Sequence, residues 1–179
     1  MVMNVKRNHL CLFLILPLLA LRLPGLAQAA FELPKNIQLN AKEDYSKYEQ
    51  TVIEAAKWLE LTEMDKETDK RREIDQFIVK WTTGTPAVNI DIGETLYTLT
   101  KGNPELLALY LASYSRYSLE NKGSAGKFSA TKAGLLSIAA VYKKGISVAR
   151  NRDMEKLVKL VSADKLDAYI EENFKIPRA

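Results

Sequence analysis

The fold is decided by two apolar runs joined by a short turn, NPELLALYLASYSRYSLENKGSAGKFSATKAGLLSIAAVY (Asn103–Tyr142). The first run opens with Asn103 as a capping side chain, a proline and an acid, which together favour a helix start. Glycines and small residues separate it from the second run, which is expected to be helical from Ser129 to Lys144 with Ser129 as its cap. Both runs are apolar almost all round at their centres, which predicts two helices covered by other elements.

Small residues recur at helical spacing along both runs. They are Ala108, Ala112 and Ser115 in the first run, and Ala130, Ala133, Gly134, Ser137 and Ala140 in the second. Small side chains let two helix backbones approach closely, so we expect these helices to cross tightly.

The first 29 residues have the pattern of a cleavable signal peptide. Lys6 and Arg7 precede an apolar run of about a dozen residues (10–21), and Ala27-Gln28-Ala29 is a small-residue cleavage signature. The run is shorter than the roughly 20 apolar residues that span a bilayer. We therefore expect cleavage after Ala29, export to the periplasm or beyond, and no stable membrane span afterwards.

Loss of this segment changes what the chain can do chemically. Lys6, Arg7 and Arg22 would leave with it and no acid would, so 23 basic and 22 acidic residues would remain. A nearly neutral chain of this kind is not expected to bind nucleic acid electrostatically. His9 and Cys11, the only histidine and cysteine, would leave too. Catalysis by Ser-His-Asp or Cys-His and ordinary zinc sites are thereby excluded from the mature chain, for which we expect no cofactor.

The remaining 150 residues suit one domain. Residues 30–43 are expected to be an extended lead-in. The first helix should start at a cap at Asp44 or Ser46 and carry the apolar stripe Tyr45, Tyr48, Val52, Ala55 and Leu59. A second should run from about Asp69 to Thr83 (Ile74, Phe77, Ile78 and Trp81 on one face), stopped by a left-handed Gly84.

The segment after this second helix is harder to assign. Residues 86–92 alternate apolar and polar side chains, which indicates a short strand or extended segment. Residues 95–100 fit either a return strand or one or two helical turns with Leu96 and Leu99 inward. An isolated hairpin is only marginally stable, which favours the helix. Two further helices are expected at Asp153–Val161 and Asp164–Phe174. The sequence thus predicts an all-α bundle of five or six helices over residues 44–176.

Ser129 and Lys132 match the S-x-x-K pattern of penicillin-recognising serine enzymes. One helical turn would place the lysine amine near the hydroxyl that it activates. No S-D-N or K-T-G element follows, so capping by Ser129 and solvation of Lys132 is the preferred interpretation.

Three other groups of residues have structural interpretations. Asn89, Asp91 and Glu94 offer oxygen ligands for Ca²⁺, but without the full pattern of a binding loop. Glu60, Glu63 and Asp65 would supply paired carboxylates of the glycosidase type, yet an acid-rich loop explains them. Lys70, Arg71 and Arg72 are interpreted as a solvated helix face. Among the aromatic residues, Tyr110 and Tyr142 are not explained by a core-facing stripe.

The motifs at Trp81–Pro86 and Asn103–Leu107, with Lys70–Arg72 and Arg152–Lys156, resemble a set of small exported helical proteins of Bacteroidetes-type bacteria whose role is undefined. The resemblance covers roughly residues 44–174. It implies an exported helical domain and brings no catalytic or metal-binding residue.

These observations predict an exported, non-enzymatic binding or interaction module of the bacterial envelope, acting on an envelope protein or component. A small hydrolase using carboxylates or Ser129 with Lys132, and a carrier of a small ligand, are the alternatives. The oligomeric state is not predicted.

Overall fold

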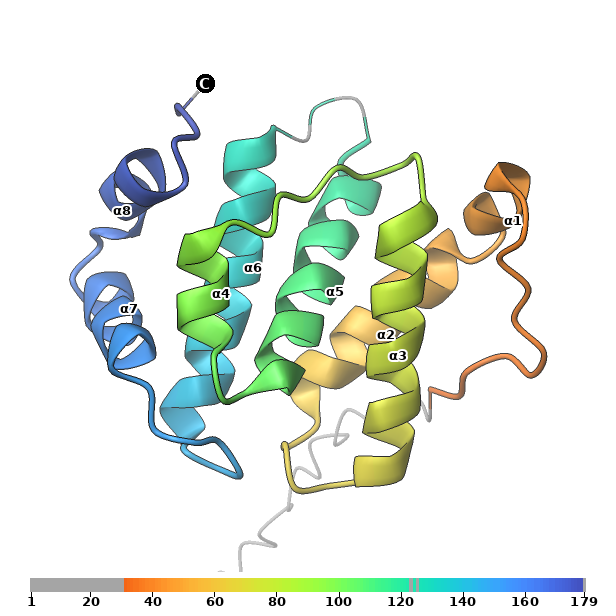
Figure 1. The fold of residues 1–179 in the computed structure, drawn as a ribbon, viewed down its shortest axis with the longest axis horizontal. Coiled ribbons are helices and arrows are strands. Elements are labelled where there is room, and N and C mark those ends of the chain that lie inside the picture. Colours follow the sequence, from red (N-terminus) through yellow and green to blue (C-terminus); the bar gives the residue numbers. More distant parts are fainter. Residues whose placement is uncertain (1–30, 123, 125, 179) are drawn as a thin grey trace, which may run out of the picture. The chain divides into compact units, whose positions relative to one another are not determined.

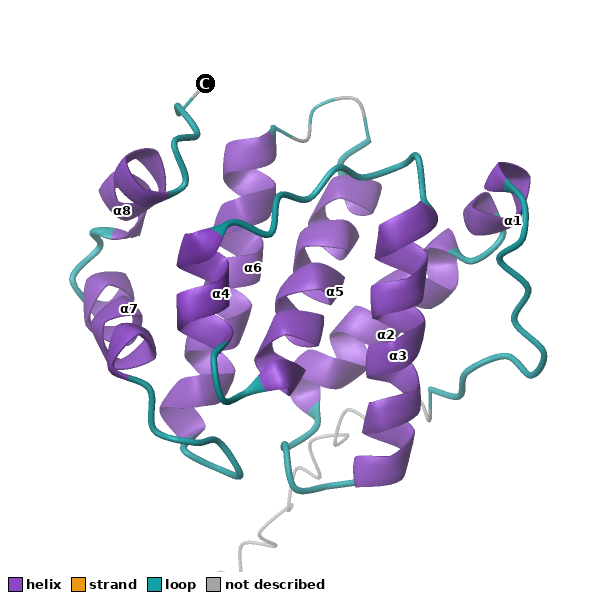
Figure 2. Ribbon diagram, viewed as in Figure 1, coloured by secondary structure: helices purple, strands orange, loops and turns teal. Residues whose placement is uncertain are grey.

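The computed structural model of this protein describes residues 31–122, 124 and 126–178. Within these residues the regular structure is helical, without a strand (Figure 2). The helices are α1 (Lys42–Ser46), α2 (Glu49–Leu61), α3 (Thr68–Gly84), α4 (Glu94–Thr100), α5 (Pro104–Glu120), α6 (Lys127–Lys144), α7 (Arg152–Ser162) and α8 (Leu166–Asn173). The predicted signal peptide lies outside the described residues.

The all-α prediction is confirmed, but the predicted number of five or six helices is wrong, because the described residues form eight. The expected first helix is divided into α1 and α2 at Lys47 and Tyr48. The indole Nε1 of Trp81 donates to the carbonyl of Tyr45 at 2.9 Å, and this tertiary contact uses the carbonyl where a continuous helix would need it. Residues 94–100 form the additional helix α4.

Helix α5 is the centre of the fold. It contacts α2, α3, α4 and α6, and Figure 1 shows it between α3 and α4. Ten of its seventeen residues are buried, on all sides of the helix. The prediction of a covered helix is therefore confirmed for α5.

Helix α6 is covered on one side only, which corrects the prediction made for the second apolar run. Leu136 is 40% exposed and Ala140 is exposed. The close approach to α5 occurs at Gly134, where a Cβ atom would lie 2.7 Å from the Tyr110 ring. Because the row of small residues winds around the helix, Gly134 packs inward while Ala140 faces solvent.

Gly84 ends α3 for a reason different from the predicted one. Its backbone is not left-handed, but a Cβ atom there would lie 1.9 Å from the Tyr45 hydroxyl. The glycine thus makes room for α1 to pack against α3.

The segment 85–93 is extended, as predicted, and crosses in front of the upper ends of α5 and α6 in Figure 1. The Tyr114 hydroxyl of α5 donates to the Asn89 carbonyl at 3.1 Å and fixes this crossing. Helix α4 follows, with Leu96 and Leu99 fully buried as predicted. No helix in the described part of the chain has the length and apolar character needed to span a membrane.

Candidate functional site

A polar cleft of about 610 Å³ lies where four parts of the chain meet. Its walls come from the segment 89–95, the middle of α5, the first turns of α6, and the tail at residues 173–177. We call this the polar cleft. Its size falls within the range of about 300–1,000 Å³ typical of small-ligand sites.

The floor of the polar cleft carries hydroxyl groups from two facing helices. Tyr110 of α5 is 1% exposed and Thr131 of α6 is 2% exposed. Burial raises the pKa of the Tyr110 phenol well above its usual range, and the Thr131 hydroxyl offsets part of that rise. Burial also raises the pKa of Tyr114. The floor therefore presents neutral phenols at physiological pH.

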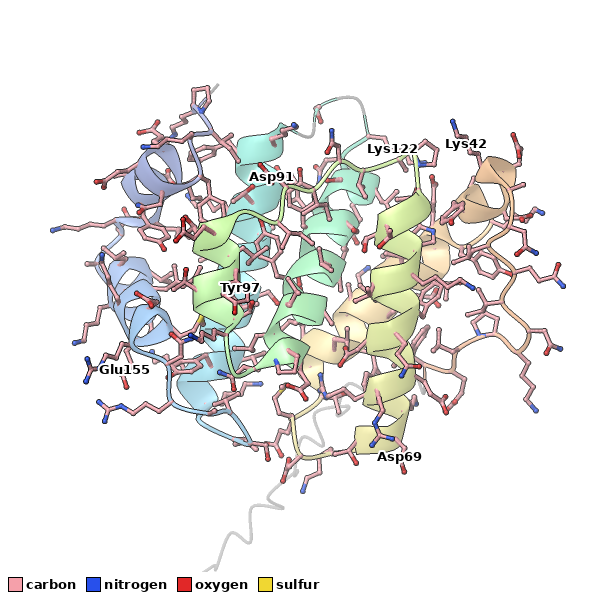
Figure 3. The ribbon with its side chains drawn as sticks, in the orientation of Figure 1. Lys42, Asp69, Asp91, Tyr97, Lys122 and Glu155 are labelled. Atoms are coloured by element: carbon pink, nitrogen blue, oxygen red, sulfur yellow. The ribbon has the colours of Figure 1, made fainter. Side chains whose placement is uncertain are left out.

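The rim of the cleft carries charges of both signs. Asp91 and Glu94 belong to the wall formed by residues 89–95, and Figure 3 labels Asp91 where that segment leads into α4. Lys127 is the first residue of α6 and Lys175 belongs to the tail. All four are exposed. In the part of the chain that is described, none of them forms an ion pair.

The tail is held in place by several contacts. The Thr95 hydroxyl donates to the Asn173 carbonyl at 3.0 Å, which joins the tail to α4. Asp167 of α8 pairs with Arg178 at 2.9 Å and also with Lys132 of α6. The hydrogen bond from Lys132 lowers the pKa of Asp167. Both ends of the tail are thus anchored to the body of the fold.

The S-x-x-K pair is not arranged for serine catalysis. The amine of Lys132 is engaged by Asp167 at 2.5 Å. Ser129 lies within α6, whose cap position is Gly126, so the prediction that Ser129 caps the helix is wrong. A lysine amine that is bound to a carboxylate is not available to activate a hydroxyl.

The carboxylates for which an acid-rich loop is preferred over glycosidase-type catalysis also have structural contacts. Glu60 accepts hydrogen bonds from the Ser113 hydroxyl at 2.8 Å and from Arg116 at 2.9 Å. Asp65 pairs instead with its neighbour Lys66. Glu60 therefore joins α2 to α5.

The three suggested calcium ligands do line one site. Asn89, Asp91 and Glu94 all border the polar cleft. Across the described residues, however, no three acidic, histidine or cysteine side chains gather as a metal-binding group. Their position favours a role in the rim of the cleft.

The two aromatic residues left unexplained by the sequence have different roles. Tyr110 forms the floor of the cleft. Tyr142 forms a structural clamp, because its hydroxyl donates to the Asn151 carbonyl at 3.1 Å and accepts from the Asn151 amide at 2.8 Å.

The prediction of a solvated face at residues 70–72 is wrong for Arg71, which is 3% exposed. Its guanidinium donates to the Thr62 carbonyl at 2.7 Å and lies over the Trp58 ring at 5.4 Å. Burial lowers the pKa of Arg71, with Asp75 opposing that shift. Arg72 is exposed and pairs with Asp69, as expected of a surface residue.

Thr131, Lys127 and the tail were missed as site residues. The only signal in the sequence is the position of Thr131 four residues after Lys127, which places both on one side of a helix start. Nothing in the sequence connects the tail to Asp91 or Tyr110, because these residues line one cleft but lie far apart in the chain.

Comparison of this chain with protein-family models, with curated proteins and with solved structures finds no match. The resemblance to exported Bacteroidetes-type proteins therefore stays a prediction.

Proposed function

We propose that this protein is an exported, non-enzymatic binding module of the bacterial envelope, and that it takes a polar ligand into the polar cleft. The observation that carries the proposal is the cleft itself, with two buried hydroxyl-bearing residues on its floor and four charged side chains at its rim that have no ion-pair partner among the described residues. A concave site with a few converging polar groups is the usual form of a small-ligand site.

Two further observations support binding through the cleft. The candidate catalytic groups Lys132 and Glu60 are occupied by structural contacts. Among the described residues, the large exposed apolar side chains come from five separate segments of the chain: Leu61, Val79, Ile92, Tyr97 and Leu136. Extended apolar patches are what usually mark a protein-docking face.

A ligand screen on the mature chain from Ala30 onward tests the proposal. Free amino acids, short peptides, disaccharides and nucleotides would be added while the methyl NMR signals of Thr131 and Ile176 are followed. A ligand in the cleft should shift both signals and leave the buried methyl groups of Ile74 and Ile78 unchanged. Hydrolysis of any of these compounds that disappears in Ser129→Ala, or in a variant of a single carboxylate, would overturn the non-enzymatic proposal.

Export is part of the proposal and has its own test. Amino-terminal sequencing of the protein recovered from the periplasm or the medium should begin at Ala30. Recovery of the intact chain from the membrane fraction would instead indicate an uncleaved anchor.

A further inference from the structure

We infer that the ligand of the polar cleft carries a cationic and an anionic group at opposite ends, as a short peptide with free termini does. This inference rests on the proposed binding function of the cleft and specifies its ligand. It comes from the way the rim charges are divided between the walls.

The two signs of charge come from different walls. Asp91 and Glu94 belong to the segment that crosses in front of α5 and α6, whereas Lys127 starts α6 and Lys175 lies in the tail. Figure 1 shows that crossing segment in front of α6, with the tail beside α8. Charges of opposite sign on different walls of an opening create an electric field between those walls.

That field discriminates between classes of ligand. A phosphate or another simple anion would be attracted by the lysines and repelled by Asp91 and Glu94. A simple cation would be attracted by Asp91 and Glu94 and repelled by the lysines. A neutral sugar can hydrogen-bond to these side chains, but it gains nothing from the difference in charge between the walls. A ligand with both charges is attracted by both walls in one orientation. In the reverse orientation each end would meet a wall of its own charge, and this repulsion gives specificity.

The rest of the cleft suits the body of a peptide. The hydroxyl groups of Tyr110 and Thr131 are neutral and are able to donate to or accept from peptide groups. Phe174, Ile176 and Pro177 supply apolar surface along the tail. The volume of about 610 Å³ is that of a drug-sized ligand, corresponding to roughly two to four residues.

The test uses the tripeptide Ala-Leu-Ala and three blocked forms of it, titrated calorimetrically into the mature chain. The forms are acetylated at the amino end, amidated at the carboxyl end, or blocked at both ends. Blocking either end should weaken binding by about tenfold, which corresponds to the loss of a partly desolvated charge contact of about 1.4 kcal/mol. The doubly blocked form should bind most weakly.

Variants of the acidic wall and of the basic walls identify which end of the peptide each wall binds. Asp91→Asn with Glu94→Gln should weaken the free peptide and remove the discrimination against the acetylated form. Lys127→Gln with Lys175→Gln should do the same for the amidated form. Glu73→Gln and Lys156→Gln, exposed residues outside the cleft, are the matched controls and should bind like the wild type.

The outcomes separate the two proposals. If doubly blocked peptide or a disaccharide binds as tightly as the free peptide at Thr131 and Ile176, the cleft is a binding site and the inference about its ligand is overturned. If no compound of the panel shifts those methyl signals, the proposed function fails as well. Each wall variant replaces exposed side chains, so an unchanged melting temperature would show that weaker binding is not caused by unfolding.

Discussion

At the scale of single residues, Asp75 is an acid whose burial is only partly compensated in the described part of the chain. Its Oδ1 atom is buried and has no hydrogen-bond partner there. Burial raises the pKa of Asp75 to about 7; Arg71, one turn earlier on α3, opposes the rise, and Glu105 of α5 adds to it. The folded protein therefore binds a proton here that the unfolded chain releases near its ordinary pKa of 3.8.

This proton makes the stability depend on pH. Between about pH 4 and pH 7 the folded state holds more protons than the unfolded state, so the free energy of unfolding should fall as the pH rises through that window. The total loss should be at most about 4 kcal/mol. Asp75→Asn should flatten this dependence in urea denaturation at pH 4 to pH 8. Asp69→Asn, at an exposed acid of the same helix, should keep the wild-type slope, and an unchanged slope in Asp75→Asn would contradict the assignment.

A second residue-scale prediction concerns Gly134. The Tyr110 ring occupies the space that a side chain at position 134 would need. A Cβ atom there would lie 2.7 Å from two ring carbons and 3.2 Å from the Tyr110 carbonyl oxygen. Gly134→Ala should destabilise the fold by a net 1 kcal/mol or so, because overpacking of about 1–3 kcal/mol exceeds the gain in helix propensity. Gly93→Ala, where no atom lies within 4 Å, is the comparison and should cost less. Equal melting temperatures for the two variants would mean that α5 and α6 move apart at Gly134 without a measurable loss of stability.

At the scale of elements, two asparagine side chains join the carboxyl-terminal helices to the core. Asn151 caps α7 by accepting from the amides of Asp153 and Met154. Its amide group also donates to the carbonyl of Thr98, at 2.9 Å, near the end of α4. Asn103 was predicted to cap α5, but it bonds instead to both backbone groups of Ala149. Each side chain thus connects segments about fifty residues apart.

Replacement of Asn151 should therefore cost more than the loss of an ordinary cap. Asn151→Ala removes the cap of α7 and the donors to α4, and should lower the free energy of unfolding by about 2 kcal/mol. Asn151→Asp keeps the acceptor but faces the α4 carbonyls with a carboxylate, so it should not restore the wild-type value. The control is Asn40→Ala at an exposed loop position. If Asn151→Asp were as stable as wild type, the contacts with α4 would be energetically unimportant.

The helices could be predicted because their signals are local. For residues 95–100 the sequence fits a return strand or a helix, and the marginal stability of an isolated hairpin favours the helix. The proline at position 104 marks the start of α5. Their surroundings could not be predicted in the same way. The burial of Arg71 depends on Trp58 and on the Thr62 carbonyl, and these contacts arise only when α2 and α3 pack together.

At the scale of the whole molecule, the candidate site is less predictable than the fold. The sequence identifies Tyr110 as an aromatic residue that no core-facing stripe explains. It also groups Asp91 and Glu94, although as possible ligands of a calcium ion. Their convergence with Thr131 and the tail depends on the crossing of segment 85–93 and the docking of α8, which no local pattern encodes. Long-range contacts of this kind determine which wall each charge belongs to.

The tail allows the site to be separated from the fold. A chain that ends at Asn173 lacks one wall of the cleft but retains the fully buried core residues on α2, α3, α5 and α6. It should remain cooperatively folded, with a small decrease in melting temperature, and lose affinity for Ala-Leu-Ala by at least about tenfold. Circular dichroism and calorimetry on the same sample measure both. Full affinity in the shortened chain would remove the tail from the site.

The placement of the two tryptophans has a consequence for spectroscopy. Trp58 lies on α2 and Trp81 on α3, both buried, and neither lines the polar cleft. Their emission therefore reports on the half of the protein that contains α1, α2 and α3. A ligand confined to the cleft should leave the emission spectrum unchanged. A spectral shift on ligand addition would show that the effect of binding crosses α5 to the far side of the bundle.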